Sequence, residues 1–510
     1  MYWGTGLGGY QQDDITSLED LPNPIKRTEA GQTYEDYARN SIYGIDSCPC
    51  LGVIKPLVIP VWFKDSTSFI SQSKKEAVRE DIRKAYFGSE KETGWHSVRS
   101  FYEKESDGRL DLDGVVSNWY EINSSYKNYF SLDDGSTEKL VEKAVDWYFT
   151  TTGESRRDYD ADGNGFIDGV FLIYAAADYF AMDDDRAENL WAYCSWLGDE
   201  TKRNALLPGP NTFFWASYDF MYGNNLAETR TGKRFYGGDT RYCSVDAHTY
   251  IHEMGHVLGL DDYYDYGENS YSPAGAFSMQ DYNVGGHDPY SLFALGYADP
   301  YIPKESCEIS LRPFQLNHDL LLLTPDWNEY DSPFDEYLLL ELYTPAGLNR
   351  FDSEHYYMNQ YPHGPNAAGI RVWHVDGRLI HVDTIKDDAI VVKGDPFTSN
   401  VFYNCKYGVA TAFNNSYQSE DFPCLLGETY ESYNLLHLIR NSKSAKLLNE
   451  NALSSQDLFK DGSKFDMNSF ASQFPRGSKL NSGKSLNWSF SVSIEGSGSN
   501  TVAKISLTKQ

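Results

Sequence analysis

Histidine and carboxylate side chains at metal-binding spacing lie in the stretch 251–262, which reads IHEMGHVLGLDD. His252 and His256 are four residues apart, so on a helix both imidazoles leave the same face and can bind one metal ion. Glu253 lies beside them, where its carboxylate could take a proton from a metal-bound water. This spacing predicts a metal-binding helix with a general base.

The end of this stretch predicts the third ligand. Gly259 can adopt the left-handed conformation that ends a helix, and the returning chain would then bring Asp262 to the metal. Two imidazoles, one carboxylate and one open coordination position are typical of a catalytic zinc site rather than a structural one. The alternative is a pair of solvated helix histidines, because this short motif also occurs by chance.

The sequence around the motif favours a helix. Ser244 or Asp246 can serve as its N-cap. An apolar stripe would face a core and leave the histidines on another side: Ala247, Ile251, Met254 and Leu258. His248 lies on the line of His252 and His256, one turn earlier, and we interpret it as a packing or supporting histidine rather than a ligand.

A methionine follows the third ligand at a short distance. The stretch 273–282 reads PAGAFSMQDY and contains Met279, which on its own would be ordinary core filling. A methionine-containing turn beneath the metal is the mark of metzincin zinc peptidases. The chain resembles the immune inhibitor A-like secreted peptidases, whose third zinc ligand is Asp. The resemblance rests on His252, Glu253, His256, Gly259, Asp262, Met279, His287-Asp288-Pro289-Tyr290-Ser291 and Leu295-Gly296-Tyr297.

The resemblance implies a secreted zinc metalloendopeptidase. Zinc held by His252, His256 and Asp262 would lower the pKa of a bound water to about 7. Glu253 would accept the proton as that water attacks a scissile carbonyl, and would pass it to the leaving amine. Protein or peptide substrates follow from this expectation.

The residues after the methionine leave one role open. Met279 is expected to shape the floor under the ligands without taking part in proton transfer. Some metzincins carry a tyrosine two residues after this methionine to stabilise the oxyanion. Here Asp281 stands at that position and Tyr282 follows it. Tyr282 and His287 are therefore only candidates for the role.

A second motif, DADGNGFID at 160–168, predicts a calcium loop. Gly165 would provide the sharp turn, and Phe171 stands where a helix–loop–helix calcium site has its bidentate Glu. A strand follows the loop, so calcium would fix the loop to a sheet. The alternative is an Asp-rich turn held by its own hydrogen bonds. The expected oxygen ligands are Asp160, Asp162, Asn164, the carbonyl of Phe166, and Asp168.

Composition limits the partners and the compartment. The 510 residues carry a net charge of −30, which argues against nucleic-acid and anionic-membrane partners. No apolar run is long enough to span a membrane. The start, Met1-Tyr2-Trp3-Gly4, lacks the features of a signal peptide, so the chain is either a trimmed mature form or cytoplasmic. Seven cysteines give no readable disulfide framework. We expect a secreted or cell-surface monomer.

The element pattern predicts a mixed α+β protein with three parts. Residues 1–50 form an irregular segment or a propeptide remnant, 51–303 a metzincin-like catalytic domain, and 304–510 a β-sandwich domain with long loops. Strands are predicted at 53–63, 110–122, 170–174, 336–342 and 369–376, with a closing hairpin at 486–507, and helices at 73–85, 95–104 and 138–148. Residues 384–483 are interpreted as long loops or insertions.

Two points of the C-terminal part stay open. His374 and Asp376 alternate onto one face and look able to bind a metal, although such a pair is more often structural. The β-sandwich could bind a surface protein or a glycan. An adhesion or carbohydrate-binding protein, and a zinc hydrolase acting on other bonds, are the competing functions.

Overall fold

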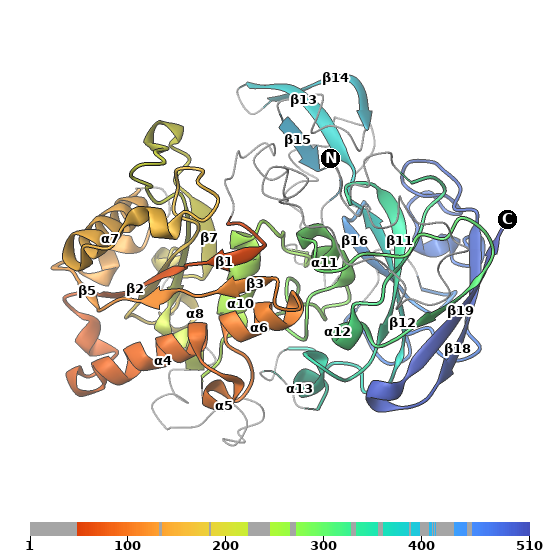
Figure 1. The fold of residues 1–510 in the computed structure, drawn as a ribbon, viewed down its shortest axis with the longest axis horizontal. Coiled ribbons are helices and arrows are strands. Elements are labelled where there is room, and N and C mark those ends of the chain that lie inside the picture. Colours follow the sequence, from red (N-terminus) through yellow and green to blue (C-terminus); the bar gives the residue numbers. More distant parts are fainter. Residues whose placement is uncertain are drawn as a thin grey trace. The chain divides into compact units, whose positions relative to one another are not determined.

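The chain has a mixed α and β fold with several separate sheets (Figure 1). The computed structural model describes residues 48–131, 135–182, 185–222, 245–265, 272–327, 333–354, 357, 361–386, 389–397, 407–410, 412, 414, 433–445 and 451–510. Within this part, Gly44–Leu260 with Tyr357–Asn359 forms a first compact unit, and Asp261–Tyr356 with Gln360–Gln510 forms a second. The domain boundary expected at 303/304 stays a prediction, and most of the segment 1–50 lies outside the described residues.

The first unit is built on a six-stranded sheet. Its order is β4 (Val115–Val116), β2 (Leu57–Trp62), β6 (Val170–Tyr174), β8 (Thr212–Ser217) and β7 (Tyr193–Trp196), with β5 (Tyr120–Glu121) also on β2. All pairs are parallel except β7 with β8, which are antiparallel. The strand predicted at 53–63 is divided at Pro56. Its first part, β1 (Gly52–Ile54), pairs with β3 (Leu110–Leu112) in a separate two-stranded sheet.

Helices cover both faces of this sheet. Alternate strand residues point to opposite sides, and every residue of β2, β6 and β8 is buried. One face packs against α7 (Ser136–Thr152) through a core that includes Ile59, Leu172 and Trp215. On the other face lie α4 (Lys75–Phe87) and α10 (His248–Val257). There the ring of Tyr86 lies 5.4 Å from that of Phe171, and the ring of Tyr250 lies 5.7 Å from that of Phe214.

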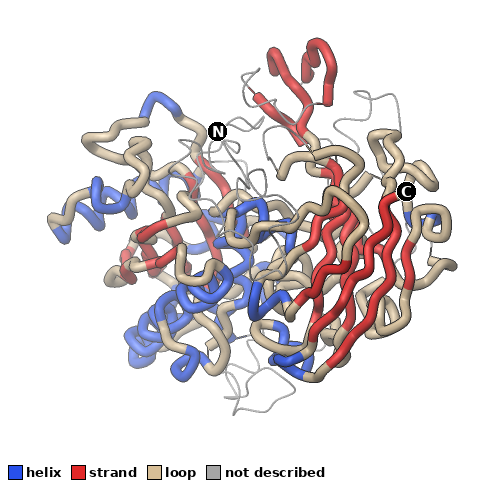
Figure 2. The backbone as a smooth tube through the Cα atoms, turned by 45° about the vertical axis from the view of Figure 1, so that its right-hand side comes forward, coloured by secondary structure: helices blue, strands red, loops and turns tan. Residues whose placement is uncertain are grey.

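The second unit contains two four-stranded sheets that share one hydrophobic core (Figure 2). One sheet has the order β10 (Leu321–Leu323), β11 (Glu336–Tyr343), β12 (Gly369–Asp376) and β16 (Leu436–Ile439). The other has the order β17 (Lys464–Phe465), β18 (Trp488–Glu495), β19 (Val502–Lys509) and β9 (Glu308–Leu311). All of these pairs are antiparallel. The shared core includes Leu340 and Val372 from the first sheet and Phe490 and Ile505 from the second.

Most predicted elements are confirmed, with shifts at their ends. The single strand predicted at 110–122 is wrong, because this stretch forms the three short strands β3, β4 and β5, which belong to two sheets. The closing hairpin forms as β18 and β19, which pair Phe490 with Leu507 and Val492 with Ile505. The interpretation of 384–483 as loops is wrong in part, because a third sheet there has the order β14 (Ala389–Phe397), β13 (Leu379–Lys386) and β15 (Tyr407–Ala410). The other α-helices are α5 (Glu90–Thr93), α6 (Val98–Glu105), α8 (Tyr179–Met182), α11 (Pro289–Leu295), α12 (Phe314–Asn317) and α13 (Asn349–Glu354).

None of the described helices has the length and the apolar character needed to span a membrane.

Candidate metal centre

Helix α10 carries the histidines and is fixed to its unit by backbone anchors. Its apolar stripe, predicted from the sequence, is fully buried. The hydroxyl of Tyr102 in α6 donates to the carbonyl oxygen of Ile251 at 2.8 Å, and that of Tyr250 donates to Ser217 at 2.8 Å. Near the end of the helix, the N–H of Cys48 donates to the carbonyl of Val257 at 3.0 Å. These bonds hold the face that carries His252 and His256 in one place.

The start of α10 is organised by a buried aspartate. Oδ1 of Asp246 accepts the backbone N–H of His248 at 3.0 Å and lies 2.7 Å from Nδ1 of the same residue. The His248 ring is buried between Trp95, at 3.9 Å between centroids, and Tyr357, at 4.1 Å. His248 is thus a packing histidine, as interpreted from the sequence. The N-cap position itself is Ala247, which has no side-chain cap bond, so the prediction of Asp246 as N-cap is wrong. Ser244, the other predicted cap, lies outside the described residues.

The chain reverses at Gly259, as its residue type predicts. Gly259 has a φ of 96°, a left-handed conformation that strains any residue with a Cβ. Its N–H donates to the carbonyl of His256 at 2.9 Å, and the N–H of Leu260 donates to Gly255 at 2.9 Å. These are the bonds that close a helix C-terminus. The same reversal directs the carbonyl of Leu260 toward the imidazole of His256.

The three predicted ligands come together. Donor atoms of His252, His256 and Asp262 lie within 4.8 Å of one another. Asp262 lies two positions beyond Leu260, the end of the segment Gly44–Leu260. Nδ1 of His256 lies 2.7 Å from the carbonyl oxygen of Leu260 and donates its proton there, which leaves Nε2 with a lone pair. That Nε2 lies 3.1 Å from Nε2 of His252.

This donor set fits a zinc ion. Two nitrogens bound at about 2.05 Å with a tetrahedral angle between them would lie about 3.3 Å apart, close to the separation of the two Nε2 atoms. The two rings are perpendicular, so their lone pairs can converge without stacking. A carboxylate completes the ligand type that catalytic zinc sites use.

Glu253 lies on the same helix and is 5% exposed. The thiol of Cys194 in strand β7 has a raised pKa because it is buried, and the charge of Glu253 raises it further. Helix α10 itself contacts the edge strand β7. This is the strand whose outer backbone edge is open within the described sheet.

Met279 lies in a turn held by buried side chains that the sequence did not single out. Met279 is fully buried, and its N–H donates to Gly286 at 3.2 Å. From α13, Oδ2 of Asp352 accepts the N–H of Gly285 at 2.9 Å, and Oδ1 of Asn349 accepts that of Gly286 at 3.2 Å. No local pattern marks these two residues, because their partners lie more than sixty positions away along the chain.

The residues that follow the methionine, among them the two candidates for oxyanion stabilisation, differ in accessibility. Asp281 is buried and accepts the N–H of Ala276 at 2.7 Å, and burial raises the pKa of its carboxyl well above the usual range. Tyr282 is 39% exposed, and partial burial, with the charge of Asp281, raises its pKa. His287 is fully buried, and its Nε2 lies 3.2 Å from Oε1 of Gln280. Of the two candidates, only Tyr282 presents surface to solvent.

The acidic loop also brings its predicted carboxylates together. One carboxylate oxygen each from Asp160, Asp162 and Asp168 lies within 4.8 Å of the others. The turn is closed by its own hydrogen bonds: the N–H of Gly165 donates to Asp160 at 3.0 Å, and that of Asn164 to Asp162 at 2.9 Å. Asn164 Oδ1 in turn accepts the N–H of Phe166 at 2.8 Å.

The loop has the marks of a cation site as well as those of a turn. Asp160 is 8% exposed, and its Oδ1 is buried without a hydrogen bond. Burial raises the pKa of Asp160, and the neighbouring Asp162 raises it further. A calcium ion would satisfy the buried oxygen and remove the repulsion between the carboxylates, so the loop fits the ion.

His374 and Asp376 do not form a metal site with each other. Nε2 of His374 lies 2.8 Å from Oε1 of Glu336, and Asp376 accepts two hydrogen bonds from Arg378. Burial alone would raise the pKa of Glu336, but the bond to His374 and its charge lower it to about 2. Both residues are structural, the interpretation favoured from the sequence.

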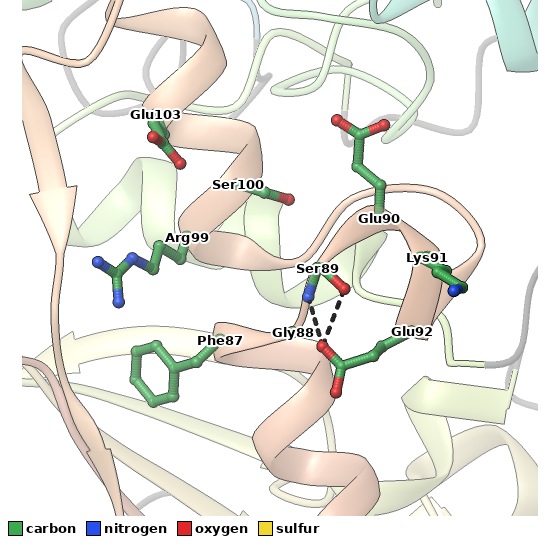
Figure 3. Close-up of a pocket in the computed structure, with 9 residues that line it drawn as sticks. All are labelled: Phe87, Gly88, Ser89, Glu90, Lys91, Glu92, Arg99, Ser100 and Glu103. Carbon is green, nitrogen blue, oxygen red and sulfur yellow. Dashed lines mark hydrogen bonds between the residues drawn. The ribbon is translucent and has the colours of Figure 1, made fainter.

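A surface cleft of about 550 Å³ lies between the end of α4, α5 and the start of α6 (Figure 3). Glu92 accepts the N–H and the hydroxyl of Ser89 in this cleft, both at 2.9 Å, and Arg99 pairs with Asp111. Two charged groups in its wall, Glu92 and Arg99, thus already have protein partners. The cleft is lined by Phe87, Gly88, Ser89, Glu90, Lys91, Glu92, Arg99, Ser100 and Glu103.

Comparisons of the chain with protein-family models and with curated proteins found no match. The function is therefore inferred from the donor geometry and from the sequence motif.

Proposed function

We propose that this protein is a secreted or cell-surface zinc metalloendopeptidase of the immune inhibitor A-like type. One observation carries the proposal: donor atoms of His252, His256 and Asp262 converge, with the carboxylate of Glu253 on the next residue of the helix. Two neutral nitrogens and one carboxylate suit a catalytic zinc ion that keeps one position open.

Zinc, when bound, would supply the polarisation of a peptide carbonyl and the acidification of a water molecule. The protein groups have separate tasks. The hydrogen bond from His256 to Leu260 fixes the tautomer and the ring orientation of that ligand. Glu253 takes a proton from the attacking water and delivers it to the nitrogen of the leaving amine. Its low exposure keeps bulk water away from this transfer.

The position of strand β7 supports a peptide as the substrate. β7 is antiparallel to β8 and lies at the end of the described sheet. The outer N–H and C=O groups of such a strand can pair with an extended peptide. Since α10 contacts this strand, a peptide bound along it would run beside the helix that carries the general base.

The fold supports the same proposal at the level of architecture. A mostly parallel sheet with one antiparallel edge strand, a ligand-bearing helix and a buried methionine turn agree with a metzincin-like catalytic domain. The two sheets of the second unit, which share a core, agree with a β-sandwich. We propose a surface protein or a glycan as the partner of this sandwich, and a structural calcium ion for the loop 160–168.

Hydrolysis of casein or gelatin tests the proposal. We expect cleavage that a chelator abolishes and zinc restores, and a loss of about 10²–10⁴-fold in Glu253→Ala with its zinc content unchanged. Glu103→Ala, which removes an exposed carboxylate from α6, is the matched control and should keep full activity.

The competing functions give other results. A binding protein would cleave neither substrate, and a zinc hydrolase of another class would act only on esters or other small substrates. Protein cleavage retained by a folded, zinc-loaded Glu253→Ala variant would reject the mechanism.

A further inference from the structure

Two leucines in the first unit are exposed to an unusual degree. Leu206 is 79% exposed and Leu207 is 59% exposed. They lie in the connection between β7 and β8, where all of 201–207 is exposed and the chain becomes buried again at Pro208. Exposed loop tips are the preferred sites of proteolytic cleavage. This loop therefore presents a side chain that many peptidases accept, at the surface of the protein.

The base of this loop is fixed to the acidic loop. The N–H of Asn204 donates to the carbonyl of Gly165 at 3.1 Å, and Nη1 of Arg203 donates to the carbonyl of Asn164 at 2.9 Å. The guanidinium of Arg203 also lies 4.7 Å from the centre of the Phe166 ring. The two segments are in such close contact that a Cβ on Gly165 would lie 2.8 Å from the Asn204 nitrogen.

One side chain organises the tip itself. Oδ1 of Asn204 accepts the N–H of Leu206 at 2.9 Å and that of Leu207 at 3.2 Å. The backbone carbonyl of Asn204 accepts the N–H of Leu207 at 3.0 Å as well. A peptidase binds its substrate as an extended chain, so this turn must open before either leucine can enter an active site.

The carbonyl groups that accept the hydrogen bonds from Arg203 and Asn204 belong to the proposed calcium loop. Asp160, Asp162 and Asp168 hold their oxygens within 4.8 Å of one another, and Oδ1 of Asp160 is buried without a hydrogen bond. Without a cation, ionised carboxylates at this distance repel one another. Relaxation of the loop would shift the carbonyls of Asn164 and Gly165, which are the acceptors for the neighbouring segment.

We propose that the Leu206–Leu207 bond is a cleavage site controlled by calcium. With calcium in the acidic loop, the segment 203–208 is a closed turn and resists peptidases. Without calcium the turn opens, water adds to the carbonyl carbon of Leu206, the C–N bond breaks, and the nitrogen of Leu207 leaves as an amine. The inference rests on the calcium site proposed above. It does not need the protein's own activity, because any peptidase that accepts leucine can serve.

Limited proteolysis tests this proposal apart from the zinc chemistry. The Glu253→Ala variant of the full chain, which removes self-cleavage, is treated with a trace of chymotrypsin in zinc-containing buffer without calcium, with calcium, or with magnesium. We expect the first new amino terminus to be Leu207, appearing at least ten times faster without calcium, with protection by calcium and not by magnesium. First cleavage outside 203–208, or the same rate with and without calcium, would overturn the proposal.

Two further variants locate the effect. Asp162→Ala should be cleaved rapidly at this bond even with calcium, whereas Asp158→Ala, which removes an exposed aspartate beside the loop, should stay protected. Asn204→Ala should be cleaved in both conditions because it loses the bonds that close the tip. Protection of Asn204→Ala equal to that of the parent chain would also contradict the proposal.

Discussion

The two candidate metal sites gather their ligands in opposite ways. The histidines of α10 are neutral donors on a helix held by buried hydroxyl groups, and a hydrogen bond to Leu260 orients one of them. The acidic loop brings three carboxylates together on a short turn closed mainly by its own backbone. The first site should keep its geometry without metal, whereas the second holds three carboxylates whose mutual repulsion a bound cation would relieve.

This difference separates catalysis from stability. Zinc removal should abolish the proposed hydrolysis and leave the helix in place, because the buried face and the anchors of α10 do not involve the metal. Calcium removal should act on folding and on the neighbouring loop. Three predictions test this contrast.

Asp162→Ala should remove the stabilisation by calcium. At calcium concentrations about a hundredfold above the dissociation constant, binding contributes about 2.7 kcal/mol, which corresponds to roughly 5–10 °C in the melting temperature of a unit of this size. The expected result is a lower melting temperature in calcium and little change without it. Differential scanning calorimetry of this variant and of the control Asp158→Ala measures the effect. An equal fall in both variants would argue against the calcium loop.

The pH dependence of stability should change sign with calcium. Burial and the neighbouring Asp162 raise the pKa of Asp160 in the folded protein. Without calcium, the stability from this carboxyl is present below its unfolded pKa of about 3.9 and is lost as pH rises through the folded value. With calcium the trend reverses, because ligation requires the ionised form. The gap between melting temperatures with and without calcium should therefore widen as pH rises, and a constant gap would contradict this.

A pair of glycine substitutions compares the backbones of the two sites. Gly259 and Gly163 have φ values of 96° and 70°, so alanine at either position costs about 1–2 kcal/mol in the left-handed conformation. Gly259→Ala should weaken zinc binding, because it disturbs the reversal that leads to Asp262. Gly163→Ala should weaken calcium binding alone. Calorimetric titration with each ion checks this, and a loss of both affinities in one variant would argue against independent sites.

The sequence predicted what is local. The spacing of His252 and His256, the reversal at Gly259 and the acidic turn depend on residues within twelve positions of one another. Strand Val170–Tyr174 has the predicted bounds because its apolar run is continuous, and Gly369–Asp376 has them although Arg371, His374 and Asp376 interrupt its apolar residues.

Contacts between distant parts of the chain could not be predicted from the sequence. The bonds from Asn349 and Asp352 to the methionine turn join distant parts of the chain, and no period or motif marks them. The anchoring of Arg203 and Asn204 on the acidic loop was missed for the same reason. The sequence of strand β14, AIVVKGDPF, does not predict a strand, because the Gly and the Pro near its end indicate a loop.

The decisive measurement is the zinc content of two variants at neighbouring positions. Asp262→Ala removes the proposed third ligand, and Asp261→Ala removes the same charge one residue earlier, from an exposed position. Elemental analysis after dialysis against trace zinc should find equimolar zinc in the unmodified protein and in Asp261→Ala, and none in a folded Asp262→Ala. Equal zinc in both variants, or no zinc in the unmodified protein, would contradict the assignment of His252, His256 and Asp262 as a catalytic metal site.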